Sequence, residues 1–195
     1  MKLKLSFALL PLVLAASAQG TVIITEVFYD APEPESKKEW IELYNPSSEP
    51  VDIGGYTIED NQYTYTISSY TMAPGQTIIC ARDSTGFYNL YGFYPEFGDL
   101  NLPLGNSGDY LILKDSNGVQ IDMVAWEGKF GWNIKADEGK SIQRKSLAQG
   151  PNAWLSNRKP NPKDPSPIPE PGTLILLGSG LAGFAGLIGY RRARR

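Results

Sequence analysis

The sequence predicts an all-β fold, a sandwich or barrel of short strands, with an apolar segment near each end of the chain. Runs of β-branched and aromatic residues recur between turn signals at fairly regular spacing. Outside the termini, no window has the 3.6-residue period of an amphipathic helix. The chain has 195 residues, of which 42% are hydrophobic and 20% charged, a composition that fits one globular domain with an apolar core.

The expected strands follow one another between residues 19 and 160. Hairpins are expected around Asp60-Asn61-Gln62 and around the Asn-Gly pair at 117–118, because such residues favour tight turns. A further turn is expected at Pro74-Gly75. The strands themselves are predicted at 22–29, 40–44, 56–59, 63–67, 77–81, 110–114, 119–126 and, as the last one, 140–144.

Residues 1–18 have the pattern of a secretory signal peptide. Two lysines precede an apolar stretch that is too short to span a bilayer comfortably. Ala16 and Ala18 then form a small-residue cleavage site directly before Gln19. We therefore expect the secretion machinery to export the chain and cleavage to leave Gln19 at the new N-terminus.

A second apolar segment covers residues 172–190. As a helix it would be about 28 Å long, against roughly 30 Å for the hydrocarbon core of a bilayer. It carries no charge and is followed by a basic tail, residues 191–195, which contains Arg191, Arg192, Arg194 and Arg195. Because positive charge stays cytoplasmic, we expect a single transmembrane helix in the inner membrane with the preceding chain facing outward.

A proline-rich stretch stands between the domain and this segment. Residues 161–168 are rich in proline and are expected to form an extended, semi-rigid linker. The linker leads into Pro169, Glu170, Pro171 and Gly172. This motif, the apolar segment and the arginine cluster together, residues 169–195, closely resemble the PEP-CTERM sorting signal. The resemblance implies cleavage by an exosortase in a Gram-negative bacterium that makes exopolysaccharide or a biofilm.

A second resemblance is spread over residues 22–154. The pieces are ITEV at 24–27, EWIELYNP at 39–46, VDIGGY at 51–56, PG at 74–75, GD at 108–109, DSNG at 115–118, ID at 121–122 and GKSIQR at 139–144. In this order they resemble the lamin-tail domain, an immunoglobulin-like β-sandwich, while residues 87–99 depart from the pattern. The family has no single transferable catalytic set, so the resemblance implies no catalytic residue here.

Composition excludes several classes of function. With one Cys and no His, the chain lacks an intramolecular disulfide, a cysteine-cluster metal site, an imidazole base and a histidine zinc site. Loss of the signal peptide and the arginine tail leaves 12 of the 18 basic residues against 21 acidic ones, a net charge of −9. Nucleic acid is therefore not an expected partner. No cofactor and no metal are expected.

Carboxylates are the first chemical candidates. Glu26 and Glu42 are expected to face each other on neighbouring strands, and paired carboxylates can serve acid–base chemistry in glycosidases. Local hydrogen bonding or a place at the solvent surface is the favoured interpretation, because no partner that would shift their pKa can be named. Asp109, Asp115 and Asp122 carry oxygen ligands for calcium, but their spacing is not that of an EF-hand loop.

Two possible nucleophiles have structural interpretations instead. Ser107 lies in Gly-Asn-Ser-Gly, which differs from a G-x-S-x-G nucleophile elbow and lacks a histidine base, so a loop is expected. Cys80 ends an apolar strand and is expected to be a buried, inert thiol.

Aromatic residues crowd two segments. Tyr91, Tyr94 and Trp132 are the candidate ligand-binding residues, since aromatic faces with polar tips can stack on sugar rings. Packing in a satellite core that closes one end of the sandwich is the favoured alternative. The two crowded sets are Phe87, Tyr88, Tyr91, Phe93, Tyr94 and Phe97, and Trp126, Phe130 and Trp132.

The function expected from these features is structural or adhesive. The chain is predicted to be an exported, non-enzymatic protein of the cell surface or extracellular matrix. It is expected to exist first as a precursor in the inner membrane, which an exosortase then cleaves. Exopolysaccharide is a candidate partner. A carbohydrate- or protein-binding module with an aromatic patch is the alternative, and a hydrolase that uses carboxylates alone is the least favoured.

Overall fold

The structure, a computed structural model, describes residues 22–164. The predicted signal peptide (1–18), the sorting motif (169–172), the apolar segment (172–190) and the basic tail (191–195) lie outside the described residues. Within 22–164, no helix has the length and apolarity that crossing a membrane requires.

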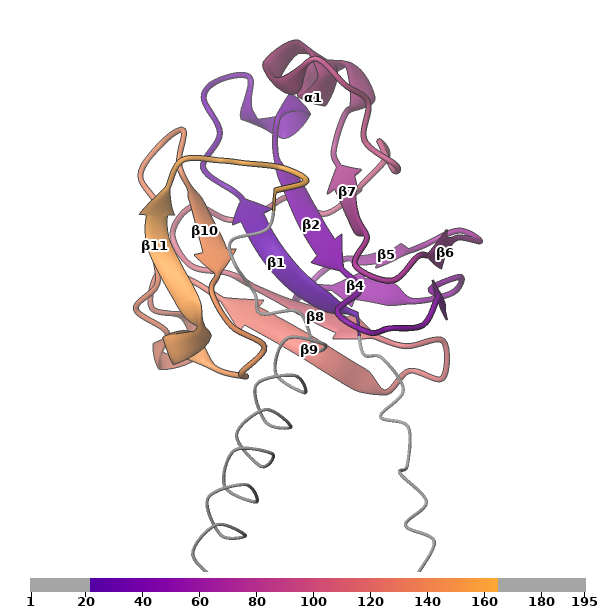
Figure 1. Cartoon of the computed structure of the whole chain (residues 1–195). Helices are drawn as coiled ribbons and strands as arrows, with labels where there is room; N and C mark the ends of the chain where they lie inside the picture. The colour runs from indigo at the N-terminus through magenta and orange to yellow at the C-terminus, as the bar shows by residue number, and fades with distance from the viewer. Residues whose placement is uncertain (1–21, 165–195) are drawn as a thin grey trace, which may run out of the picture.

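Two antiparallel sheets form the body of the molecule (Figure 1). One has five strands in the order β11-β10-β1-β2-β7, and the other has four in the order β5-β4-β8-β9. The first sheet comprises β1 (Ile23–Phe28), β2 (Trp40–Tyr44), β7 (Thr77–Ala81), β10 (Ser141–Arg144) and β11 (Trp154–Arg158). The second comprises β4 (Thr57–Glu59), β5 (Thr64–Thr66), β8 (Tyr110–Lys114) and β9 (Gln120–Ala125). This mostly-sheet architecture confirms the all-β prediction and is consistent with an immunoglobulin-like sandwich.

The smaller elements connect these sheets. A two-stranded ladder pairs β3 (Val51–Asp52) with β6 (Thr71–Met72). One α-helix, α1 (Ser84–Tyr91), follows β7 at the top of the molecule in Figure 1. Three short 3-10 helices are η1 (Glu35–Lys37), η2 (Lys129–Gly131) and η3 (Pro151–Ala153).

The main core fills the space between the two sheets. On β2, Ile41 and Leu43 belong to this core, whereas Trp40 and Tyr44 lie in separate clusters away from it. The alternation of strand side chains produces this division. From the four-stranded sheet, Leu111, Leu113, Val124 and others enter the same cluster. Burial of this apolar surface is the main stabilisation of the fold.

A buried ion pair links the two sheets inside the core. Arg144 of β10 donates from its Nη2 to both carboxylate oxygens of Asp122 on β9, at 2.6 and 2.7 Å. Both side chains are fully buried. The remaining groups are also satisfied, because Ile24 donates its N–H to Asp122 and accepts from Nε of Arg144 through its carbonyl. A buried pair of this kind is costly to break from one side.

The expected hairpins are present. The β4–β5 pair turns at 60–63, and the β8–β9 pair turns through 115–118. Gly118, in the β8–β9 turn, has φ +79°, and Gly75, in the turn between β6 and β7, has φ +69°. L side chains rarely adopt this region, so each of these two turns requires glycine.

Helix α1 corrects the prediction that the domain contains no helix. Asp83 caps its N-terminus by accepting from the N–H of Gly86 at 2.6 Å, and Gly92 ends it with φ +78°. The helix has eight residues, two turns, which is too short for a clear periodic signal. Gly86 packs on η1 so closely that a Cβ would lie 1.7 Å from the carbonyl oxygen of Lys37.

The C-terminal part of the domain also differs from the prediction. The strand at 140–144 is not the last one, because β11 pairs with it and forms the edge of the five-stranded sheet. After β11, residues 159–164 run across the outer face of that sheet (Figure 1), and we call this segment the strap. The first residues of the expected linker therefore lie on the sandwich. Residues 22–164 therefore contain both sheets, the core between them and the strap.

Candidate functional site

A pair of buried carboxylates lies on the outer face of the five-stranded sheet. Glu26 and Glu42 are opposite each other in the β1–β2 ladder, as expected from the sequence. A β-bulge between Ile24 and Glu26 shifts the register, so Thr25 and Glu26 both turn away from the main core. Glu26 is 2% exposed and Glu42 is 0% exposed.

Glu26 accepts hydrogen bonds from three donors on one oxygen. Its Oε1 accepts from the hydroxyl of Ser141 at 2.6 Å, from Nε2 of Gln143 at 3.0 Å and from the N–H of Asn161 at 3.2 Å. Ser141 and Gln143 belong to β10, and Asn161 belongs to the strap. Gln143 also binds the strap, by donating to the carbonyl of Lys159 at 2.8 Å and to the side chain of Asn161.

Glu42 is satisfied on both of its oxygens. Thr25 donates its hydroxyl to Oε1 at 2.6 Å, and Lys163 of the strap donates its backbone N–H to Oε2 at 2.6 Å. The ammonium of Lys163 continues outward to Glu96, at 2.6 Å. The two carboxylates thus bind the strap through its backbone, and the strap covers them.

Burial raises the pKa of both carboxyls. The pKa of Glu26 rises to about 7 because burial outweighs its hydrogen bonds to Ser141 and Gln143. The pKa of Glu42 also rises to about 7, first through burial and further through the neighbouring charge of Glu26. Both carboxyls therefore keep their protons to a higher pH than an ordinary glutamate does. Acid–base chemistry on a substrate would need open access to these oxygens, and the strap occupies it.

The three aspartates considered for calcium are not brought together. Asp122 is engaged by Arg144, and Asp109 accepts from the N–H groups of Gly105 and Tyr110 at 3.0 and 2.8 Å. Asp115 accepts from the N–H groups of the β8–β9 turn. Across the part of the chain that the structure describes, no group of three or more His, Cys, Asp or Glu is placed to hold a metal ion.

The two nucleophile candidates lie where the sequence predicted. Cys80 is a free thiol, fully buried in the main core on β7, and burial raises its pKa. Ser107 lies in the loop before β8. Neither has the setting of an activated nucleophile.

The proposed ligand-binding aromatics do not form one patch. Trp132 is buried in the main core. Tyr91 packs against the separate cluster under α1, where its hydroxyl accepts from Nε1 of Trp40 at 3.1 Å. Only Tyr94, 64% exposed, presents its ring to solvent, and it stacks on Tyr88 with ring centroids 4.6 Å apart. Most of the crowded aromatics thus serve packing, as the favoured interpretation expected.

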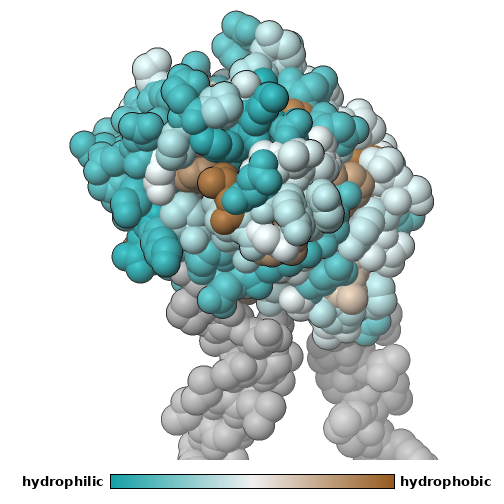
Figure 2. All heavy atoms as spheres, turned by 90° about the horizontal axis from the view of Figure 1, so that it is seen from above, coloured by the Kyte–Doolittle hydropathy of each residue, from teal (hydrophilic) through white to brown (hydrophobic). Residues whose placement is uncertain are grey.

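The surface around α1 contains little continuous apolar area. On the face seen from above in Figure 2, hydrophobic residues lie in small separate areas within a mostly hydrophilic surface. The exposed large hydrophobic residues among 22–164 are Tyr63, Tyr88, Leu90, Tyr94, Val119 and Phe130. Single exposed hydrophobic residues of this kind are normal on protein surfaces and do not mark a binding site by themselves.

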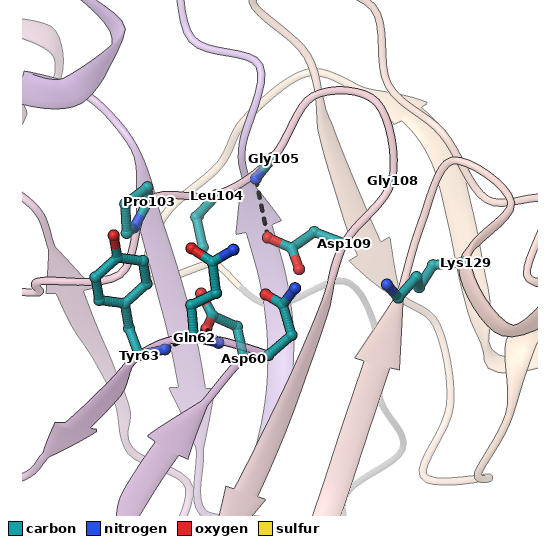
Figure 3. A pocket seen from close by; sticks show the side chains of 10 residues that line it. Asp60, Gln62, Tyr63, Pro103, Leu104, Gly105, Gly108, Asp109 and Lys129 are labelled. Carbon is teal, nitrogen blue, oxygen red and sulfur yellow. Dashed lines mark hydrogen bonds between the residues drawn. The ribbon is translucent and has the colours of Figure 1, made fainter.

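A polar cleft beside the β4–β5 hairpin was missed from the sequence. It has a volume of about 350 Å³ and is bordered by the turn residues 60–63, by the loop before β8 and by Lys129 (Figure 3). The sequence identified Asp60-Asn61-Gln62 only as a turn. Its mixture of amide and carboxylate side chains next to tyrosine was the signal that could have pointed to a binding surface. A second, smaller hollow of about 320 Å³ lies between Glu127 and Lys135.

These features define the class of the molecule: an antiparallel β-sandwich with a buried acidic pair under its C-terminal strap. A comparison with protein-family models matches residues 15–128 to the Lamin Tail Domain. The chain belongs to this family, as its sequence motifs suggested. The match ends before β10 and β11, although β10 pairs directly with β1 in the same sheet. No curated protein matched the chain.

Proposed function

We propose that this chain is an exported, non-enzymatic protein of the cell surface or extracellular matrix, sorted and cleaved by an exosortase at Pro169 to Gly172. Its lamin-tail sandwich is the delivered cargo, and residues 172–190 hold the precursor in the inner membrane until it is cut.

One structural observation gives this proposal its main support. The strap fixes the chain to the outer face of the sheet up to Lys163, through Glu26, Glu42 and Glu96. The sorting motif begins five residues beyond Asp164, the last described residue. A folded domain would then stand close to the motif without including it, which leaves an extended stretch for a membrane enzyme to bind.

A binding module for carbohydrate or protein is the second candidate. The exposed stack of Tyr88 and Tyr94 favours it, because exposed aromatic faces contribute strongly to recognition. A carboxylate-dependent hydrolase has less support, since the strap covers the oxygens of Glu26 and Glu42 that such a reaction would use.

Terminal peptide mass spectrometry on the protein from its own organism tests the proposal. The expected species, from envelope and medium, begins at Gln19 and ends near Pro169 to Gly172. Extra mass at the new C-terminus would identify an attached group. An intact chain through Arg195 in every fraction would contradict exosortase sorting.

A pair of variants separates sorting from folding. Glu170→Ala should leave the precursor uncut, because it removes the only charged side chain of the motif. Glu49→Gln, an exposed change on the sandwich, is the matched control and should be processed as the natural chain is. Equal processing of both variants would show that the motif is not the recognition element.

A further inference from the structure

The cleft beside the β4–β5 hairpin has the dimensions of a ligand site. Its volume of about 350 Å³ falls within the range of roughly 300–1,000 Å³ that small-molecule sites occupy. Figure 3 shows Tyr63 and Pro103 at one end, Lys129 at the other, and Gln62 between them. Three separate parts of the chain therefore converge on one concave surface.

Several polar side chains in this cleft form no hydrogen bond with the rest of residues 22–164. Within residues 22–164, the amide side chains of Asn61 and Gln62 form no hydrogen bond, and both residues are exposed. The ammonium of Lys129 forms no ion pair there and lies over the rings of Tyr110 and Phe130, 5.4 and 5.8 Å from their centroids. These groups are open to a ligand that both donates and accepts hydrogen bonds.

The walls of the cleft are fixed before any ligand arrives. Asp60 closes the hairpin turn by accepting on Oδ1 from the N–H groups of Gln62 and Tyr63, both at 2.6 Å. On the facing wall, Asp109 accepts from the N–H of Gly105 at 3.0 Å, and Trp126 donates to the carbonyl of Gly105 at 2.8 Å. The backbone on both sides of the cleft is therefore held in place, and binding has to order only the side chains that it carries.

An aromatic surface completes the cleft. Tyr63 is 44% exposed and its ring stands beside Pro103 (Figure 3). A tyrosine ring offers an apolar face and a polar hydroxyl tip, a combination that suits a sugar ring with its C–H face and hydroxyl edge. Tyr63 is not one of the aromatic residues that the sequence selected.

The charges of the cleft disfavour a strongly charged ligand. Two carboxylates, Asp60 and Asp109, face a single ammonium, Lys129. An anionic ligand would be repelled by the two carboxylates. A cationic ligand would be repelled by Lys129, and both oxygens of Asp109 already accept hydrogen bonds from backbone N–H groups. A neutral polyhydroxylated ligand avoids both conflicts and can use the two amides fully.

We infer that this cleft binds a neutral sugar residue of a polysaccharide, with its ring against Tyr63 and its hydroxyls on Asn61, Gln62 and Lys129. The inference deepens the proposed function and rests on it, because a matrix protein needs a surface that meets glycan. It places recognition at the β4–β5 hairpin and away from Tyr91, Tyr94 and Trp132.

Nuclear magnetic resonance titration tests the inference on residues 19–168, which contain both sheets and the strap. The probes are neutral tetrasaccharides of glucose, galactose and mannose, with tetragalacturonate as the acidic comparison. We expect saturable shifts of the backbone amides of Gln62, Tyr63, Gly105 and Gly108 with at least one neutral probe. The expected Kd is about 0.1–1 mM, typical of a shallow site that holds one or two sugar rings.

Two exposed variants provide the matched comparison. Tyr63→Ala should weaken binding at least about fivefold, since it removes the stacking face. Val119→Ala trims an exposed apolar side chain outside the cleft and should leave Kd unchanged. Unchanged amide shifts elsewhere in each spectrum would show that the variant is folded.

The inference is overturned by any of three results. These are no saturable shift with any neutral probe up to about 10 mM, unchanged binding in Tyr63→Ala, or shifts centred on Tyr88 and Tyr94. If the cleft binds no glycan while the chain is still cut at Gln19 and near Pro169, only this inference fails. If the chain is neither exported nor cut, the proposed function fails even though glycan binding in the cleft stands.

Discussion

The buried pair of Glu26 and Glu42 should make the sandwich less stable as the pH rises. The pKa of each carboxyl is about 7 in the folded chain, against 4.5 for an ordinary glutamate. Between these values the folded chain keeps a proton that the unfolded chain has already released. Raising the pH therefore favours unfolding, and the stabilisation present below about pH 4.5 is lost as the pH passes through 7.

The size of the effect follows from the shift in pKa. One pKa unit corresponds to about 1.4 kcal/mol, so each carboxyl contributes a loss of about 3 kcal/mol over this range. Both residues are almost fully buried, so solvent screening reduces this little. Glu39, whose pKa burial also raises to about 7, adds to the same trend.

Urea denaturation of residues 19–168 at about pH 5 and about pH 8 measures this dependence. Glu42→Gln keeps the shape of the side chain and removes its titration, together with its charge beside Glu26. The variant should lose about 3 kcal/mol less than the natural sequence between the two pH values, and Glu49→Gln, an exposed control, should match the natural sequence. Our reasoning would be refuted if Glu42→Gln kept the full pH dependence, or if the natural domain were more stable at the higher pH.

Three further predictions concern the core and the helix. Arg144→Ala should lower the free energy of unfolding, measured by urea denaturation, by about 3–5 kcal/mol, because it leaves Asp122 buried without its cation. The double variant Arg144→Met with Asp122→Leu should recover part of that loss. An Arg144→Ala variant as stable as the natural domain would contradict this. Gly86→Ala should lower Tm, measured by calorimetry, by more than Gly92→Ala does, since only the first places a Cβ against the carbonyl of Lys37. The reverse order would count against the packing of α1 on η1. Cys80 should react with a thiol reagent only after unfolding, because burial raises its pKa and blocks access; immediate labelling of the native domain would disprove its place in the core.

Local pattern was enough to predict the faces of β2 and the pairing of its glutamate. Alternation within 40–44 separates Ile41 and Leu43 from Glu42, and the structure divides them in the same way. The hairpins at 60–63 and 115–118 were also predictable, because turn chemistry is local. In the sequence, only the capping residues Asp83 and Gly92 could have indicated helix α1, because two turns carry too little periodicity.

The strap could not be predicted, because it depends on contacts between distant parts of the sequence. Lys163 meets Glu42 across 121 positions, and no local pattern records such a contact. The aromatic residues posed a related problem. Residue type alone does not distinguish Phe87, which is fully buried, from its neighbour Tyr88, which is exposed. Only the packing of α1 on the sheet decides which ring faces solvent.

The strap also determines how the sandwich would respond to mechanical tension. A pull on the chain beyond Asp164 reaches the sheet first through the bonds of Lys163 to Glu42 and Glu96, and then through Asn161 to Glu26. Under such a pull we expect these bonds to break one after another, so that water reaches the acidic pair before β11 is loaded. We therefore expect the strap to detach first, so that moderate force would release a few residues of chain and leave both sheets intact.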